Sequence, residues 1–166
     1  MRGTVELIIA RFRPSICEGR MEDLSDAALY QAVGLATLGS QIFEKVFVVT
    51  VRFAVMQDDV HSFDGIKSVE TAKVFKQATT ALLKQISGSV HIAQLEERIS
   101  QLLEDRHRVI HRLVDEGGWP GPCTDAQRVE ILELCTRVRS ESVALSEALA
   151  PLMAGWVSRF PEIEQA

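Results

Sequence analysis

Apolar residues recur at helical spacing along most of the chain, and the longest run follows Ser25. Serine commonly caps helices, so we predict a helix from Ser25 to about Gln57 with Asp26 in its first turn. Gly34 and Gly39 would weaken this helix unless another backbone approaches closely there. The apolar arc covers roughly half of the circumference, which requires neighbours on more than one side, in a bundle core or at a subunit interface. The central stripe comprises Ala28, Ala32, Leu35, Leu38, Ile42, Val46, Val49 and Phe53, and Phe43, Phe47 and Ala54 widen it.

Two further helices are expected in the middle of the chain. Residues 58–66 form a predicted loop, and a second helix covers about 68–86 and ends at Gly88. Ser89 is then expected to cap a third helix, which stops at Gly117 and Gly118. The second helix is expected to bury Ala72, Phe75, Leu82 and Ile86; the third carries an apolar stripe of Ile92, Leu95, Ile99, Leu102, Leu103, Ile110 and Leu113.

The start of a fourth helix is marked by Thr124 and Gln127, which match a capping box. The preceding segment, Trp-Pro-Gly-Pro-Cys at 119–123, cannot be helical. Pro151 is expected to kink or restart the helix, and Trp156 and Phe160 to close the bottom of the core. The stripe of this helix is Ile131, Leu134, Cys135, Val138, Leu145 and Leu149.

These elements predict an all-α fold, an antiparallel four- to five-helix bundle. Residues 1–22 carry no clear pattern and are treated as an N-terminal arm, and 23–166 are expected to form a single domain. Hydrophobic residues make up 46% of the chain and aromatic residues only 6%, a balance that favours a helical domain over a β-sandwich.

Charge and cysteine content limit the environment and partners. The formal net charge of −5 means that a polyanion could bind only at a local basic patch. Cys17, Cys123 and Cys135 form no Cys-x-x-Cys pair, so we expect free thiols in a reducing compartment. The apolar run at 7–10 is too short for a signal peptide, and that at 43–56 contains Lys45 and Arg52 and is too short to span a bilayer. We therefore expect a cytoplasmic protein without membrane contact.

Arg106 interrupts the apolar stripe of the third helix. At about 100° per residue it falls near the middle of that stripe, with His107 and His111 beside it. A guanidinium facing the core is unfavourable unless an anionic or polar group meets it. Such a departure from the local pattern is typical of a functional site.

An arginine and a histidine in this arrangement can cleave RNA without metal. The histidine moves a proton between the ribose 2′-hydroxyl and the leaving oxygen, since its pKa lies near neutrality. The arginine binds the scissile phosphate and stabilises its growing charge. In an α-helix Arg106 and His111 lie about 140° apart. A dimer with two of these helices facing each other would gather both pairs into one cleft.

The stretch LLEDRHRVIHRL, late in the third helix, resembles the HEPN superfamily, which has an Arg, four to six residues and then a His. Members often have Asn, Asp or His directly after the Arg, as His107 is here, and the resemblance covers roughly residues 25–150. It implies a homodimeric, metal-independent endoribonuclease, often part of a toxin–antitoxin or phage-defence system. By this resemblance Arg106 would bind phosphate, His111 would be the general acid and base, and His107 would support them.

The chain departs from one HEPN subset. That subset has a Tyr two residues after the His, which partner nucleotidyltransferases modify, and Leu113 stands at this position here.

Three other charged residues could support the motif. Glu44 could pair with Arg106 or orient a histidine, although its helical angle places it on the narrow polar face. Arg108 and Arg112 could guide RNA toward the cleft, or be solvated surface charges.

Two other functions remain open. Some HEPN proteins bind nucleotide or act only as dimeric scaffolds, so the alternative is a non-catalytic helical module that binds a nucleotide or protein partner. A metal-dependent bundle enzyme is less favoured: His107 and His111 have zinc-pair spacing and Glu104-x-x-His107 is half of a di-iron pattern, but no second Glu-x-x-His exists. We therefore expect no metal or other cofactor.

Overall fold

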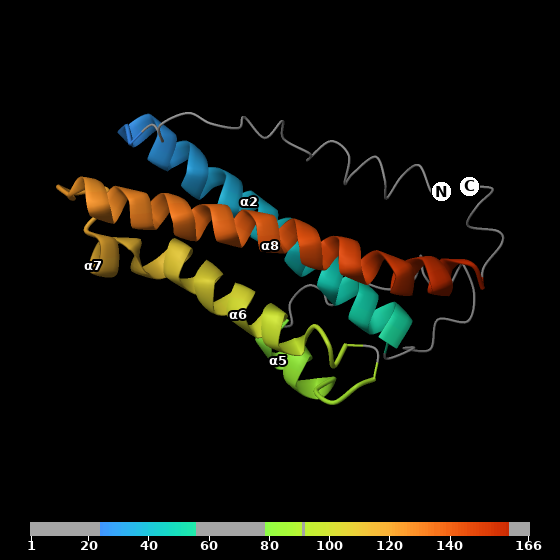
Figure 1. Ribbon diagram of the computed structural model, residues 1–166. Coiled ribbons are helices and arrows are strands. Elements are labelled where there is room, and N and C mark those ends of the chain that lie inside the picture. Colours follow the sequence, from blue (N-terminus) through green and yellow to red (C-terminus); the bar gives the residue numbers. More distant parts are fainter. Residues whose placement is uncertain (1–23, 56–78, 91, 160–166) are drawn as a thin grey trace.

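The computed structural model describes residues 24–55, 79–90 and 92–159 (Figure 1). Within these ranges the chain is mostly helical and contains no strand, which confirms the all-α prediction. The elements in chain order are α2 (Asp26–Val49), η1 (Thr50–Val55), α5 (Thr79–Gln85), α6 (Glu96–His107), η2 (Arg108–Arg112), α7 (Leu113–Gly117) and α8 (Asp125–Val157). Both η segments are π-helical and continue directly from the α-helix before them.

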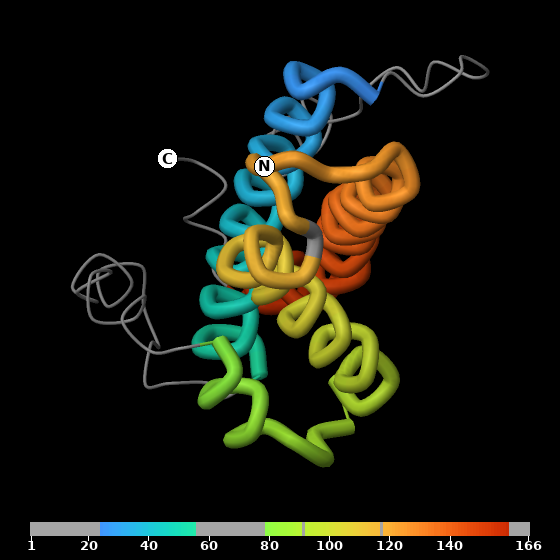
Figure 2. Tube along the Cα trace, turned by 90° about the vertical axis from the view of Figure 1, so that its left-hand side faces the viewer, coloured from blue at the N-terminus to red at the C-terminus, as the bar shows by residue number. Residues whose placement is uncertain are grey.

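Helices α2 and α8 lie side by side along their length and run in the same direction (Figure 1). Their first turns are joined by Arg128, which donates to Asp26 Oδ1 at 2.7 Å. At the other end, Phe53 of η1 contacts Trp156 of α8, with ring centroids 5.4 Å apart. Helix α6 runs in the opposite direction to both, and α5 lies near its start (Figures 1 and 2). The antiparallel arrangement thus holds for α6, while α2 and α8 form a parallel pair.

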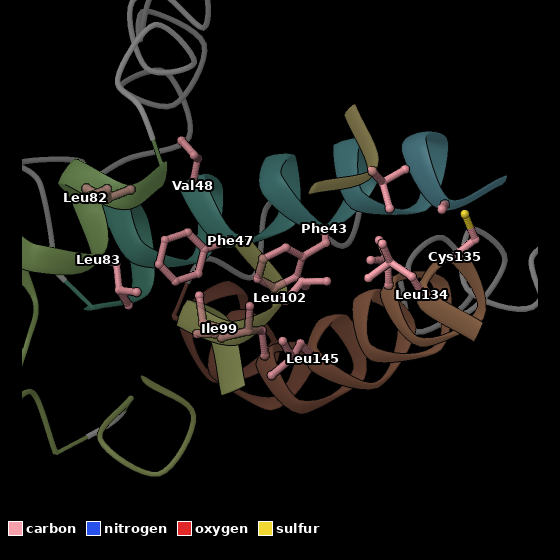
Figure 3. Packing of buried hydrophobic residues seen from close by; sticks show 14 of the residues in the cluster. Phe43, Phe47, Val48, Leu82, Leu83, Ile99, Leu102, Leu134, Cys135 and Leu145 are labelled. Carbon is pink, nitrogen blue, oxygen red and sulfur yellow. The ribbon is translucent and has the colours of Figure 1, made fainter. Parts of the chain in front are cut away.

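The core lies between these helices, and aromatic side chains of α2 fill its centre. Phe43 and Phe47 are fully buried and point toward Ile99, Leu102 and Leu145 (Figure 3). All six stripe residues predicted for the fourth helix are buried, as are Leu82 and Ile86 from the second. Trp156 is buried against η1, but in a small cluster separate from the main core; Phe160 lies outside the described residues.

The buried face of α2 differs from the predicted stripe. Leu29, Ala36 and Ser40 are buried together with the two phenylalanines, whereas Leu38 is 53% exposed, so the prediction for Leu38 was wrong. The face toward α8 is set by close helix approach: a Cβ on Gly39 would lie 3.8 Å from Ser142 Cβ. Close packing is therefore confirmed at that glycine. At Gly34 it stays a prediction, because no neighbouring helix among the described residues lies within 4 Å of the corresponding position.

Several helix boundaries follow the sequence and two do not. Ser25 accepts a hydrogen bond from the Ala28 N–H, and Thr124 and Gln127 form the predicted capping box. Gly118, at φ 70°, ends the third helix. Helix α6, however, begins only at Glu96, because the Ser89 carbonyl accepts from Ile92 and Ala93 in preceding turns. Pro151 lies within one continuous helix, so the predicted restart was wrong.

Helix α2 and η1 together are long and apolar enough to cross a membrane by length and composition, a test that core helices of soluble proteins also pass. Only 28% of the most apolar window is buried within the described protein. The predicted arm at 1–22, the loop at 58–66 and the start of the second helix lie outside the described residues.

Candidate functional site between α2 and α6

Arg106 lies in the last turn of α6 and pairs with α2. Its Nη2 atom is 3.3 Å from Glu44 Oε2, and the two side chains are 27% and 24% exposed. Its Nε is buried and has no hydrogen-bond partner among the described residues. The pairing expected as one role of Glu44 is therefore present, and the guanidinium is held between two helices while keeping N–H groups unused.

Burial raises the pKa of the Glu44 carboxyl, and the positive charge of Arg106 opposes this rise in part. The sequence placed Glu44 on the narrow polar face of α2. In the structure this face lies against α6 and η2, so Glu44 reaches Arg106. The pair is thus a half-buried charge contact, the type that holds a side chain in place more than it stabilises the fold.

The two histidines lie next to each other at the same end of α6. The ring centroids of His107 and His111 are 5.0 Å apart with the planes inclined by 47°. His107 is partly buried and His111 is exposed. An exposed imidazole beside a partly buried one leaves the outer ring accessible to a substrate.

The regular α-helix, which the sequence predicts to continue through both histidines, ends at His107, so His111 lies beyond it. The helix changes to π-helical hydrogen bonding over Arg108–Arg112, between α6 and α7. Bonds from residue i to i+5 place residues five apart closer to one side than α-helical bonds do. The predicted angle of about 140° between Arg106 and His111 assumed an α-helix throughout. π-Bulges of this kind occur frequently at functional sites.

Asp105 is the charged residue that lies deepest in this region, and sequence reasoning missed it. It is 3% exposed and lies on the buried face of α6 with Leu102, and Val109 of η2 is buried one turn further on. The buried face therefore lies about one residue before the predicted stripe, and Arg106 borders it rather than occupying its middle. The spacing of Leu102, Asp105 and Val109 was visible in the sequence, but choosing between two overlapping stripes required the position of α8.

Arg137 of α8 pairs with this carboxylate. Its Nε donates to Asp105 Oδ2 at 2.7 Å, and Gln101 Nε2 donates to Asp105 Oδ1 at 3.2 Å. The hydrogen bond to Asp105 raises the pKa of the Arg137 guanidinium. Two consecutive residues of α6, Asp105 and Arg106, thus pair with different helices, α8 and α2.

The two arginines proposed to guide RNA lie on the outer side and are already paired. Arg108 Nε is 2.9 Å from Glu116 Oε2. Arg112 Nη1 lies 3.5 Å from Glu116 Oε1 and 4.0 Å from Glu104 Oε1. The hydrogen bond from Arg108, with the nearby charge of Arg112, lowers the pKa of Glu116. This surface is therefore close to neutral rather than strongly basic.

Within the described residues, no three His, Cys, Asp or Glu side chains are grouped so that they could hold a metal ion. In comparisons with known proteins, no family model, no curated protein and no solved structure matches the chain.

Proposed function

We propose that the protein is a metal-independent endoribonuclease of HEPN type, with a composite active site at a homodimer interface. The observation that carries this proposal is the grouping at the end of α6. A restrained guanidinium, Arg106, stands on the same helix end as two adjacent imidazoles, His107 and His111, one of them exposed. This supplies a phosphate ligand and a proton carrier together.

In the proposed reaction His111 takes the proton of a ribose 2′-hydroxyl, whose oxygen attacks the adjacent phosphorus. A new oxygen–phosphorus bond forms, the bond to the leaving oxygen breaks, and that oxygen takes a proton from an imidazolium, His111 of the second subunit in the composite site. The products are a cyclic phosphate and a free hydroxyl. Arg106 stabilises the charge on the phosphate oxygens, and His107 supports the outer imidazole.

Glu44 holds Arg106 through Nη2, and because Nε is buried, the remaining N–H groups at the two Nη atoms are the ones left for phosphate oxygens. This arrangement reduces the conformational freedom that the arginine would lose on binding substrate. Arg108 and Arg112 pair with carboxylates through Nε and Nη1, so they would contact the RNA backbone with their remaining N–H groups.

The homodimer part of the proposal is supported by the uncovered apolar surface of α2. Tyr30 and Leu38 are 59% and 53% exposed, and most of the apolar window of this helix is not buried by described residues. A second copy would cover such a surface and bring a second Arg–His pair to the site. By its resemblance to HEPN proteins we propose a cytoplasmic toxin or phage-defence component, with an antitoxin protein as a further partner.

The alternative function, a non-catalytic dimeric module that binds a nucleotide or protein, is favoured by one observation. The carboxylates of Glu104 and Glu116 stand beside the two arginines that would attract RNA, and the net charge of the chain is −5. A nearly neutral surface provides little long-range attraction for a polyanion.

Incubation of purified protein with RNA in EDTA separates these functions. We expect cleavage with cyclic phosphate ends, and loss of cleavage in Arg106→Ala and His111→Ala with helical content unchanged. Arg98→Ala removes an exposed arginine of the same helix and is the matched control. Intact RNA at high protein excess, or equal loss of activity in the control, contradicts the nuclease.

A further inference from the structure

Burial of the Asp105 carboxylate costs free energy, which its hydrogen-bond partners must offset. A carboxylate that is 3% exposed on an apolar helix face is unfavourable unless each oxygen has a donor. Arg137 supplies one donor and Gln101 the other, at 2.7 and 3.2 Å. An apolar residue would pack in this place without such partners, so the pair has a role that packing alone does not require.

The location of the pair suggests that role. Asp105 directly precedes Arg106, and the π-helical segment begins at Arg108. Consecutive helical residues point about 100° apart, so fixing the direction of one fixes the direction of the next. Because Asp105 is tied to α8, Arg106 is directed toward α2, where it meets Glu44.

We propose that Asp105 and Arg137 are positioning residues, which set the rotation of α6 about its axis so that Arg106 enters the seam between α2 and α6. The inference rests on the proposed function for its catalytic consequence, since Arg106 is the phosphate ligand of that reaction. Its structural part, the burial of the Arg106 Nε, can be measured without any substrate.

The matched control is the contact between Arg98 and Glu141. It joins the same two helices at the same 2.7 Å, but its side chains are 46% and 30% exposed and it lies nearly two turns earlier in α6. Removing it tests whether any loss of an α6–α8 ion pair disturbs Arg106.

The experiment measures hydrogen exchange of arginine Nε–H groups by ¹⁵N NMR in the full chain, with the Arg106 resonance assigned from Arg106→Lys. In the parent protein we expect this resonance to be protected. Asp105→Asn and Arg137→Gln should lose the protection, Arg137→Lys should largely retain it, and Glu141→Gln should leave it unchanged. Asp105→Leu, which suits an apolar face, is the second test should Asp105→Asn fail to fold.

If Arg106 stays protected in a folded Asp105 variant, or if the Glu141→Gln control loses protection equally, the proposal is wrong. In cleavage assays Asp105→Leu should lower kcat about 100-fold with KM little changed, the effect of a displaced group rather than of lost binding. A parent protein that does not cleave RNA contradicts the proposed function alone, because the exchange comparison still decides the positioning role.

Discussion

Arg106 and Glu44 come from different helices and meet at 3.3 Å in a seam where both side chains are about three-quarters covered. The contact joins the residue that departs most clearly from the apolar pattern of α6 to a largely covered carboxylate of α2. It explains why a guanidinium is tolerated beside the core. It also links the charge state of one carboxyl to the placement of the proposed phosphate ligand.

Stability should depend on the protonation of Glu44. Burial raises the pKa of this carboxyl above 4.5 in the folded protein, so the folded state holds the proton more tightly than the unfolded chain. Its contribution to stability is therefore fully present below pH 4.5 and is lost as pH rises through the raised pKa. The unfolding free energy of the parent minus that of Glu44→Gln should fall as pH rises toward neutrality.

Denaturant unfolding over this pH range measures that difference, and Glu97→Gln, which replaces an exposed carboxylate of α6, is the control. A difference that rises with pH for Glu44→Gln would show that pairing with Arg106, not burial, dominates the carboxyl.

The two partners of the Asp105–Arg137 pair should differ in their effect on stability. Arg137→Met leaves a buried carboxylate with Gln101 alone and should cost about 3 kcal/mol. Asp105→Leu leaves an arginine that is half exposed and can turn to water, so the cost should be below about 1 kcal/mol. Urea unfolding measures both, and equal losses would contradict the asymmetry.

Substitutions at the two glycines of α2 should have opposite effects. Gly39→Leu meets the backbone and Ser142 of α8 and should cost about 1–3 kcal/mol. A Cβ at Gly34 has no described neighbour within 4 Å, and leucine improves helix propensity, so Gly34→Leu should raise stability by up to about 1 kcal/mol. Thermal unfolding at low protein concentration compares the two variants. A loss of stability in Gly34→Leu would mean that the outer face of α2 is covered within one chain.

The proposed homodimer predicts that a charge at Leu38 separates the subunits. This side chain is 53% exposed on α2, and a carboxylate buried without a partner in an interface is strongly unfavourable. Leu38→Glu should reduce the molar mass found by light scattering from dimer to monomer without loss of helicity. Lys84→Glu on the exposed side of α5 should leave the dimer intact. A monomeric parent protein contradicts the dimer itself.

Local patterns predicted much of the fold. Ser25 and Thr124 mark helix starts because their side chains satisfy free N–H groups of the first turn, and Gly118 marks an end because it adopts a positive φ. The fourth-helix stripe is buried as predicted, since its apolar residues recur at helical spacing on one face. These features depend on neighbours in sequence, so the sequence is sufficient to place them.

The candidate site was predicted less completely. Arg106, His107 and His111 were chosen because charge and imidazole interrupt an apolar helix, and the structure places the three at one helix end. Asp105 and Arg137 were missed because they lie 32 residues apart and meet only when α6 packs on α8. The π-helical turn was missed because its hydrogen-bond pattern depends on packing rather than on a residue motif.

The sequence alone determined that the chain is helical, where several of its helices begin and end, and that an arginine and two histidines interrupt an apolar helix. Each of these follows from periodicity, capping and composition within a few turns. Only the tertiary structure decided which side of α2 is buried, that α2 and α8 run parallel, and that Asp105 rather than Arg106 occupies the core-facing position. Helices that are apolar over half their circumference allow several packings, and contacts between distant segments select one of them.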